Sequence, residues 1–207
     1  MGVCEKVNSI TGVLLAGGES KRFGEPKAFA EYNGRKLWQY SMEVLKVTTE
    51  QQIIISHQDL LKEFQKATQE KILTDDHRFI GDGPKAGIYT AMKNETSEWF
   101  VILSCDIPLI TADIIRRLLT YIDSDKKMII PKIEGRVHPL IGVYHHSVFP
   151  IIEEQLESND RKLMTLFDQV NVCFVTEKEL QSDAKTFSNI NSRRDYGMLL
   201  NNGKITE

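Results

Sequence analysis

Short apolar runs alternate with amphipathic stretches along the chain, and this alternation predicts the order of strands and helices. Continuous apolar runs predict buried strands at 10–15, 53–55, 71–74, 99–103, 128–130 and 140–144. Apolar positions at helical spacing predict helices at 37–45, 59–67, 85–94 and 111–122. Asp59 and Thr111 are the expected N-caps of the second and fourth of these helices. The alternation predicts an α/β fold whose mostly parallel sheet is covered on both faces.

The pattern weakens beyond residue 148. Apolar residues in 151–156 predict a helix, the polar stretch 159–162 a loop, and 163–167 another helix. The run 172–175 is a plausible edge strand. Because no linker-like, repeated or low-complexity stretch interrupts the chain, we interpret residues 1–207 as a single domain.

Composition and charge narrow the class of protein. The chain is 41% hydrophobic and 27% charged, as expected of a globular protein with a real core. A net charge of −3 gives no reason to expect a nucleic acid or an anionic membrane as partner, so any anionic substrate needs a local cationic cluster. Three cysteines without a CxxC pair, no signal-peptide pattern and no membrane-length apolar run predict a cytoplasmic protein without a membrane anchor.

Ligands of an open parallel sheet lie beyond the carboxyl ends of its strands, so the loops after the strands are the informative ones. The loop after the first strand contains Gly17 and Gly18, which permit positive φ and let backbone amides approach phosphate oxygens. Lys21, Arg22 and Lys27 could neutralise a triphosphate. The loop has neither the GxxxxGK[ST] nor the GxGxxG spacing. A plain glycine turn beside a solvated basic loop is the alternative.

Asp106 follows the strongest predicted strand directly. A carboxylate at the carboxyl end of a central strand is placed to bind magnesium, which prefers carboxylate together with substrate phosphates. Asp106 could instead merely cap the next helix, although Thr111 is better spaced for that role. Cys105 has no histidine base nearby in the sequence and is interpreted as a buried structural thiol.

A third unusual loop follows the strand at 71–74. It begins with Asp75 and continues into a glycine- and proline-rich turn at 81–87. Such a turn leads tightly into a helix, whose N-terminus can take a phosphate or present amides to a base. A mobile acidic surface loop is an equally good interpretation of these residues.

Taken together, these loops resemble one family. Leu-Ala-Gly-Gly-x-Ser-x-Arg-x-Gly from Leu15, Gly-Pro-x-Ala-Gly-Ile from Gly83 and Cys-Asp-x-Pro from Cys105 are similar to motifs of the molybdenum cofactor guanylyltransferases. Arg-Val-His-Pro-Leu at 136–140 and Ser-Asn-Ile-Asn at 188–191 fit the same family. The resemblance spans roughly residues 10–196. The first motif is shared with many sugar-nucleotide and cytidylyl transferases, whereas the combination is far more selective.

The resemblance implies a fold and an activity. The fold would be a single-domain, Rossmann-like three-layer α/β sandwich with a mostly parallel central sheet. The reaction would be the magnesium-dependent transfer of GMP from GTP to molybdopterin, with or without bound molybdate, releasing pyrophosphate. The N-terminal half would bind GTP and the C-terminal half the acceptor. Other molybdenum cofactor proteins would be transient partners, while neither nucleic acid nor membrane is expected.

The resemblance also assigns roles to individual residues. Arg22, Lys27 and Asp106 would be catalytic, with Asp106 also holding magnesium. The nucleotide would be bound by Leu15, Ala16, Gly17, Gly18, Lys27, Asp75, Gly83, Pro84 and Asp106. The acceptor would be bound by Arg136, His138, Asn189 and Asn191.

Three departures from the family pattern leave the contacts to base and pterin open. Ser56 stands where relatives often have Asn, Lys85 where Leu is common, and Ser192-Arg193 where Thr-Pro is common. A nucleotidyltransferase with CTP as donor or a sugar phosphate as acceptor is one alternative. A non-catalytic molybdopterin carrier is another, although a carrier does not need both Lys27 and Asp106.

Overall fold

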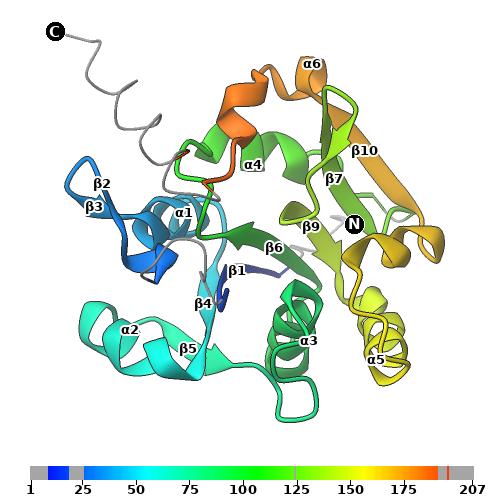
Figure 1. Cartoon of the computed structure of the whole chain (residues 1–207). Coiled ribbons are helices and arrows are strands. Elements are labelled where there is room, and N and C mark those ends of the chain that lie inside the picture. Colours follow the sequence, from blue (N-terminus) through cyan, green and yellow to red (C-terminus); the bar gives the residue numbers. More distant parts are fainter. Residues whose placement is uncertain (1–8, 19–25, 124, 191–194, 196–207) are drawn as a thin grey trace, which may run out of the picture.

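The computed structural model describes residues 9–18, 26–123, 125–190 and 195. One sheet of eight strands forms its centre, in the order β10-β7-β9-β6-β1-β4-β5, with β8 paired to β7 (Figure 1). The strands are β1 Ile10–Ala16, β4 Gln51–Ser56, β5 Lys71–Thr74, β6 Trp99–Ser104, β7 Met128–Ile133, β8 Arg136–Val137, β9 Ile141–His145 and β10 Val172–Thr176. A separate short hairpin joins β2 (Glu31–Tyr32) to β3 (Arg35–Lys36).

Strand direction decides which loops meet at each edge of the sheet. β6, β1, β4 and β5 are neighbours and run parallel, so their carboxyl ends share one edge. β9 runs antiparallel to both β6 and β7. Because Leu103 near the end of β6 pairs with Ile141 at the start of β9, the residues leading into β9 lie at that same edge. The predicted mostly parallel sheet is confirmed.

Helices cover both faces of the sheet. The α-helices are α1 Leu37–Lys46, α2 Leu61–Ala67, α3 Pro84–Asn94, α4 Ala112–Leu119, α5 Phe149–Glu157 and α6 Glu177–Leu180. Short 3-10 helices are η1 Lys27–Phe29, η2 Gln58–Leu60, η3 His146–Val148, η4 Leu163–Asp168 and η5 Ala184–Phe187. α1, α2, α4 and α6 share one apolar core with the sheet, whereas α3 and α5 form a second core on the opposite face (Figure 1). The predicted three layers are therefore present.

All six residues of β6 are buried, as expected of a strand covered on both faces. The edge position predicted for 172–175 is confirmed, since β10 is the outermost strand beside β7. The helix predicted at 163–167 is a 3-10 helix, η4. The two-residue strands β2, β3 and β8 were not predicted because such short pairs leave no periodic signal. Each helix in the described parts of the chain is too short or too polar to cross a bilayer.

One of the two predicted N-caps is wrong, and the other is confirmed in position only. Asp59 is not an N-cap, because it lies inside η2 and its backbone N–H donates to Nδ1 of His57 at 3.3 Å. The imidazole of His57 therefore takes the capping role, and α2 begins only at Leu61. Thr111 does occupy the N-cap of α4, but its hydroxyl makes no capping hydrogen bond. That helix ends at Leu119, three residues before the predicted end.

Candidate active site

The carboxyl edge of the parallel strands gathers most of the chemically interesting residues. Asp106 follows β6, Gly17 follows β1, His57 follows β4 and Asp75 follows β5, and these four strands are consecutive neighbours in the sheet. Ligands of open α/β sheets bind at such an edge. The structure thus brings together, along one edge, four loops whose residues are as much as 89 positions apart in the chain, from Gly17 to Asp106.

Asp106 is held at both carboxylate oxygens. Its Oδ2 lies 2.9 Å from Nζ of Lys27, and its Oδ1 accepts a hydrogen bond from the hydroxyl of Ser104 at 2.5 Å. The side chains of Lys27 and Asp106 are only 17% and 13% exposed. Beneath them, the hydroxyl of Ser41 on α1 donates to the backbone carbonyl of Ser104 at 2.8 Å. The carboxylate therefore has a fixed orientation, and sequence reasoning had not identified either serine.

Cys105 is buried beside this carboxylate, as expected of a structural thiol. Burial, reinforced by the charge of Asp106, raises the pKa of its thiol to about 12, so the thiol stays protonated at neutral pH. Its backbone N–H donates to the carbonyl of Leu15 at 3.1 Å. This bond joins the loop after β6 to the end of β1 and so fixes the distance between the two.

Gly17 and Gly18 expose the backbone at the end of β1. Neither glycine adopts the positive φ that a glycine pair permits. A Cβ on Gly17 would lie 3.6 Å from the backbone nitrogen of His57, and one on Gly18 would meet nothing within 4 Å. Both glycines are exposed, and their contribution is the absence of a side chain rather than an unusual backbone conformation. Arg22, the predicted catalytic arginine, lies outside the described residues.

The turn after β5 does require glycine. Gly81 and Gly83 have φ of 79° and 76°, in the left-handed region that favours glycine. Gly83 is the N-cap of α3 and Pro84 its first residue, a position where proline costs no hydrogen bond. Oδ2 of Asp75 accepts a hydrogen bond from the backbone N–H of Gly81 at 3.4 Å. Burial raises the pKa of Asp75, and this hydrogen bond opposes the effect.

Leu15 and Asp75 meet over the first turn of α3. A Cβ placed on Gly87 would lie 2.9 Å from Cδ2 of Leu15 and 3.9 Å from Oδ1 of Asp75. Gly87 therefore lets the helix approach the ends of β1 and β5 closely. The predicted nucleotide residues in the described part of the chain accordingly form one continuous edge, from Asp106 through the glycine pair to the Gly83–Pro84 turn.

Asp76, the neighbour of Asp75, has a structural environment. Its carboxylate pairs with Nζ of Lys93 at 2.5 Å and accepts the backbone N–H of Arg78 at 3.0 Å. Burial would raise the pKa of Asp76, but Lys93 and Arg78 outweigh it and lower the pKa to about 2. This carboxylate stays charged and anchors the loop to α3. These contacts fold the loop into a defined turn against α3.

The predicted acceptor residues lie near the start of β9. Arg136 is exposed on β8, and the backbone N–H of His138 donates to the carbonyl of Pro131 at 2.9 Å. Burial, with the nearby charge of Arg136, lowers the pKa of His138, which favours a neutral imidazole. The ring of His138 lies 5.4 Å from that of Phe187 in η5. This contact brings the segment after η5 to the same side of the molecule.

The segment after η5 returns to Asp106 at the carboxyl edge of the sheet. The backbone N–H of Ile190 donates to the backbone carbonyl of Asp106 at 2.9 Å. The side chain of Ile190 is buried in a small apolar cluster with Tyr32 and Leu37. Asn189 is thereby placed next to a residue bonded to Asp106, while Asn191 lies outside the described residues. The binding of the acceptor by Asn189 stays a prediction.

Comparison with known proteins identifies the family to which the chain belongs. The family described as "MobA-like NTP transferase domain" matches residues 12–173. A protein named "Probable molybdenum cofactor guanylyltransferase" from Geobacillus sp. (strain WCH70) is 38% identical over 92% of this chain and 97% of its own. One of the same name from Halalkalibacterium halodurans is 40% identical over 89% and 94%. The chain belongs to the molybdenum cofactor guanylyltransferase family. It is an enzyme of the nucleotidyltransferase class.

Solved structures agree on the fold. The molybdopterin-guanine dinucleotide biosynthesis protein A of Archaeoglobus fulgidus superimposes with a TM-score of 0.81 at 20% identity, covering 93% of this chain and 98% of that one. The 4-diphosphocytidyl-2C-methyl-D-erythritol synthase of Anaerococcus prevotii gives a TM-score of 0.73 at 12% identity, covering 95% and 96%. A guanylyltransferase of this family therefore shares its fold with enzymes that are named for a different nucleotide.

The donor set of this guanylyltransferase suits a magnesium ion that arrives with a nucleotide. Among the described residues, no three histidine, cysteine or acidic side chains cluster tightly enough to form a metal site of their own. Asp106 offers one carboxylate of fixed orientation, and the hydroxyl of Ser104 lies beside it. Magnesium commonly uses one or two carboxylates and completes its shell with phosphates and water. The residues present fit that mode of binding.

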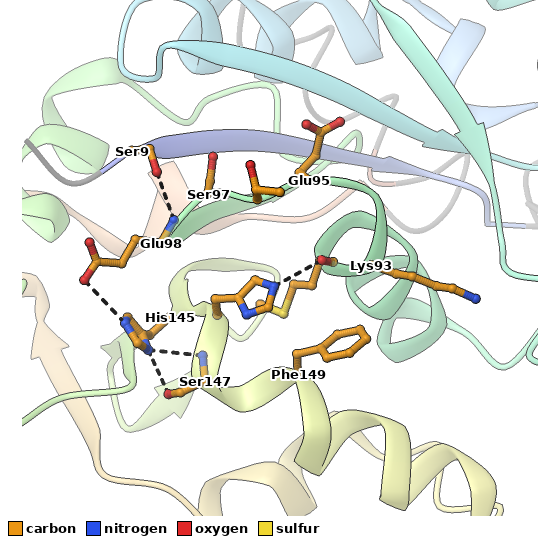
Figure 2. A pocket seen from close by; sticks show the side chains of 11 residues that line it. Ser9, Lys93, Glu95, Ser97, Glu98, His145, Ser147 and Phe149 are labelled. Carbon is orange, nitrogen blue, oxygen red and sulfur yellow. Dashed lines mark hydrogen bonds and ion pairs between the residues drawn. The ribbon is translucent and has the colours of Figure 1, made fainter.

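A hollow of about 940 Å³ lies at the opposite edge of the guanylyltransferase sheet (Figure 2). Its walls come from the residues before β1 and β6, the end of α3 and the start of α5, and include Ser9, Glu98, His145 and Phe149. Both ring nitrogens of His145 face protein groups, since Nδ1 lies 2.7 Å from the hydroxyl of Ser147 and Nε2 3.7 Å from Glu98. Because its lining residues lie before β1 and β6, whereas Asp106 follows β6, this hollow is separate from the edge that carries Asp106.

Proposed function

We propose that this guanylyltransferase transfers GMP from GTP to molybdopterin and releases pyrophosphate. The support comes from the names of its close relatives and from the arrangement of the carboxyl edge. The observation that carries the proposal is the position of Asp106. Its side chain pairs with Lys27 on the donor side, and its backbone carbonyl bonds Ile190 on the acceptor side. Asp106 would thus lie between the two substrates, where the phosphates of donor and acceptor would react.

The donor would lie along the ends of β1, β5 and β6. The main chain at the end of β1, from Leu15 and Ala16 to the exposed Gly17 and Gly18, would approach its phosphates, while Asp75 and the Gly83–Pro84 turn would face the nucleoside. Lys27 would neutralise charge on the triphosphate. Arg136, His138 and the segment ending at Ile190 would hold the acceptor. The donor and acceptor would then meet at Asp106.

The chemical step needs no strong base. An anionic oxygen of the terminal phosphate of molybdopterin attacks the α-phosphorus of GTP, a new P–O bond forms, and the bond to the β-phosphate breaks. Pyrophosphate leaves with the electron pair, and no proton has to be removed from the attacking oxygen. Magnesium held by Asp106 would supply positive charge at the reacting phosphates. Lys27 and backbone amides would stabilise the remaining charge as it moves toward pyrophosphate.

Turnover with defined substrates tests the proposal. The purified protein, magnesium, molybdopterin and each of GTP, CTP, ATP and UTP are incubated separately, and both pyrophosphate and the dinucleotide mass are measured. GTP should give the guanine dinucleotide and far exceed the other donors. A dinucleotide formed best from CTP would refute the choice of base. Pyrophosphate release with a sugar phosphate but not with molybdopterin would refute the acceptor.

The remaining expectations follow from this activity. A protein that uses GTP is expected to work in the cytoplasm, where the nucleotide is available. Brief contacts with other molybdenum cofactor proteins are the expected means of delivering the dinucleotide. Pull-down of the purified protein with such partners, in the presence and absence of the dinucleotide, tests this expectation.

A further inference from the structure

Lys85 is a charged residue buried completely inside the protein. It stands in the first turn of α3, directly after Gly83 and Pro84, and its side chain has no solvent-exposed surface. A buried ammonium group is costly unless hydrogen bonds replace its water. The question is therefore what its side chain reaches.

The ammonium group of Lys85 reaches the stretch of residues 155–165, which runs from α5 into η4 and is called here the α5–η4 segment. Its Nζ donates to Oε1 of Gln155 at 2.7 Å, to the backbone carbonyl of Asp160 at 2.9 Å and to the hydroxyl of Thr165 at 3.3 Å. The carboxylate of Asp160 lies 3.8 Å away. All three donors of the ammonium group are thus directed at residues distant in sequence, and they join the start of α3 to this segment.

A second bond ties the same two parts together. Nε of Arg161 lies 2.8 Å from Oδ1 of Asp82, and the side chain of Asp82 is only 14% exposed. Asp82 stands between Gly81 and Gly83, the two residues of this turn with positive φ. The turn of residues 81–84 is therefore attached to the α5–η4 segment on both sides, by Asp82 before Gly83 and by Lys85 after Pro84.

The arrangement is poorly explained as a device for stability. Nε2 of Gln155 is buried without a hydrogen-bond partner, and such a group destabilises a fold by about 1–3 kcal/mol. Replacing buried polar partners by apolar residues of similar shape is often neutral or stabilising. Lys85 and Gln155 instead determine the position of the 81–84 turn, because the hydrogen bonds of the ammonium group are directional.

We propose that Lys85 is a positioning residue, which holds the 81–84 turn against the α5–η4 segment and thereby sets the affinity for the donor nucleotide. The inference rests on the proposed function, in which Gly83 and Pro84 face the base. Main-chain groups can recognise a base only if the turn is held still. Lys85 does not touch the substrate in this arrangement; it acts through the turn.

Kinetics of Lys85→Met test this role, because methionine keeps much of the side-chain length and removes the ammonium group. The KM for GTP should rise about tenfold, while kcat and the KM for molybdopterin stay within about twofold of wild type. Ile152→Val is the matched control: Ile152 is fully buried in α5 and its truncation lowers stability without touching the turn. This control should leave the KM for GTP unchanged at a similar loss of thermal stability.

A double variant separates position from stability. Lys85→Met combined with Gln155→Leu removes the unpaired amide and fills the site with apolar groups, so the melting temperature should recover. The KM for GTP should stay raised, because the bond to the carbonyl of Asp160 is still missing. If the melting temperature and the KM for GTP both returned to wild-type values in the double variant, the proposal would be overturned. It would also be overturned if Lys85→Met left the KM for GTP unchanged, or raised the KM for GTP and the KM for molybdopterin equally.

Hydrogen exchange makes the test independent of turnover. The backbone amides of residues 81–83 should exchange at least about fivefold faster in Lys85→Met than in wild type, while those of β6 are unaffected. If the wild-type protein gives no dinucleotide, the proposed function fails, but this comparison still shows whether Lys85 holds the turn. Unchanged exchange at 81–83 overturns the positioning role even when turnover is normal.

Discussion

Removing the carboxylate of Asp106 should abolish turnover and leave the fold intact. Within the described part of the returning C-terminal segment, the bond to Asp106 uses its backbone carbonyl, so Asp106→Ala preserves the contact with Ile190. The side chain bonds only Lys27 and Ser104 among the described contacts. Because both side chains are largely buried, losing this ion pair should cost more than the ~1 kcal/mol of an exposed pair, but less than the about 5–15 kcal/mol that keeps a domain folded.

The expected effect on the reaction comes from the charge of the metal ion. Two unit charges about 4 Å apart interact by ~4 kcal/mol at an effective dielectric constant of about 20, which describes a partly buried site. Losing an interaction of that size at the reacting phosphates lowers kcat/KM by about a thousandfold. The loss is that large only if Asp106 anchors the metal ion at the α-phosphate.

The assay is pyrophosphate release at GTP and molybdopterin concentrations well below their KM, which gives kcat/KM, over a range of magnesium concentrations. Thermal unfolding of the same preparations confirms that the variant is folded. Asp113→Ala is the matched control, since Asp113 is an exposed aspartate of α4 paired with Arg116. A folded Asp106→Ala protein that keeps more than about a tenth of wild-type activity, a barrier change below ~1.4 kcal/mol, would show that the metal assignment is wrong.

Three further predictions concern other parts of the site. Lys27→Ala should weaken GTP binding and slow the chemical step, and equal kcat/KM in both proteins would exclude its role at the triphosphate. Asn189→Ala with Asn191→Ala should lower molybdopterin affinity with little change for GTP; calorimetric titration with each ligand decides, and equal losses would indicate a merely structural segment. Asp76 has its pKa lowered to about 2, so its stabilising effect is complete above about pH 4 and is lost as the pH falls toward 2. Urea unfolding of wild type and Asp76→Asn should therefore converge over that range, and a constant difference would contradict the assignment.

Sequence periodicity was sufficient for the elements that carry their own signal. The all-apolar run before Ser104 predicted the central strand, and its buried environment explains why the run is uninterrupted. Asp106 and the glycine pair could be located because each directly follows such a run. The antiparallel direction of β9 could not be predicted, since a buried strand looks the same in either direction. That direction is what brings His138 to the catalytic edge.

Long-range polar contacts were also beyond the sequence. The serines beneath Asp106 lie 63 residues apart, and no local pattern pairs Ser41 with Ser104. Lys85 looked like a mere departure from the family pattern, because a lysine in a helix is usually solvated. Only the packing of α3 against α5 shows that it is buried and where its three hydrogen bonds go. Tertiary contacts thus decided its role.

The bond between Ile190 and Asp106 has a consequence for the synthesis of the protein. The four parallel strands and Asp106 are complete once residue 106 has left the ribosome, whereas the partner of the Asp106 carbonyl emerges 84 residues later. Folding proceeds as the chain appears, from the N-terminus onward. The ends of the four parallel strands are therefore expected to form on the nascent chain while Ile190 is still missing. The 81–84 turn gains its contacts only when residues 155–165 have emerged, so a nascent chain that ends between residues 165 and 190 would bind GTP before the bond to Asp106 completes the site.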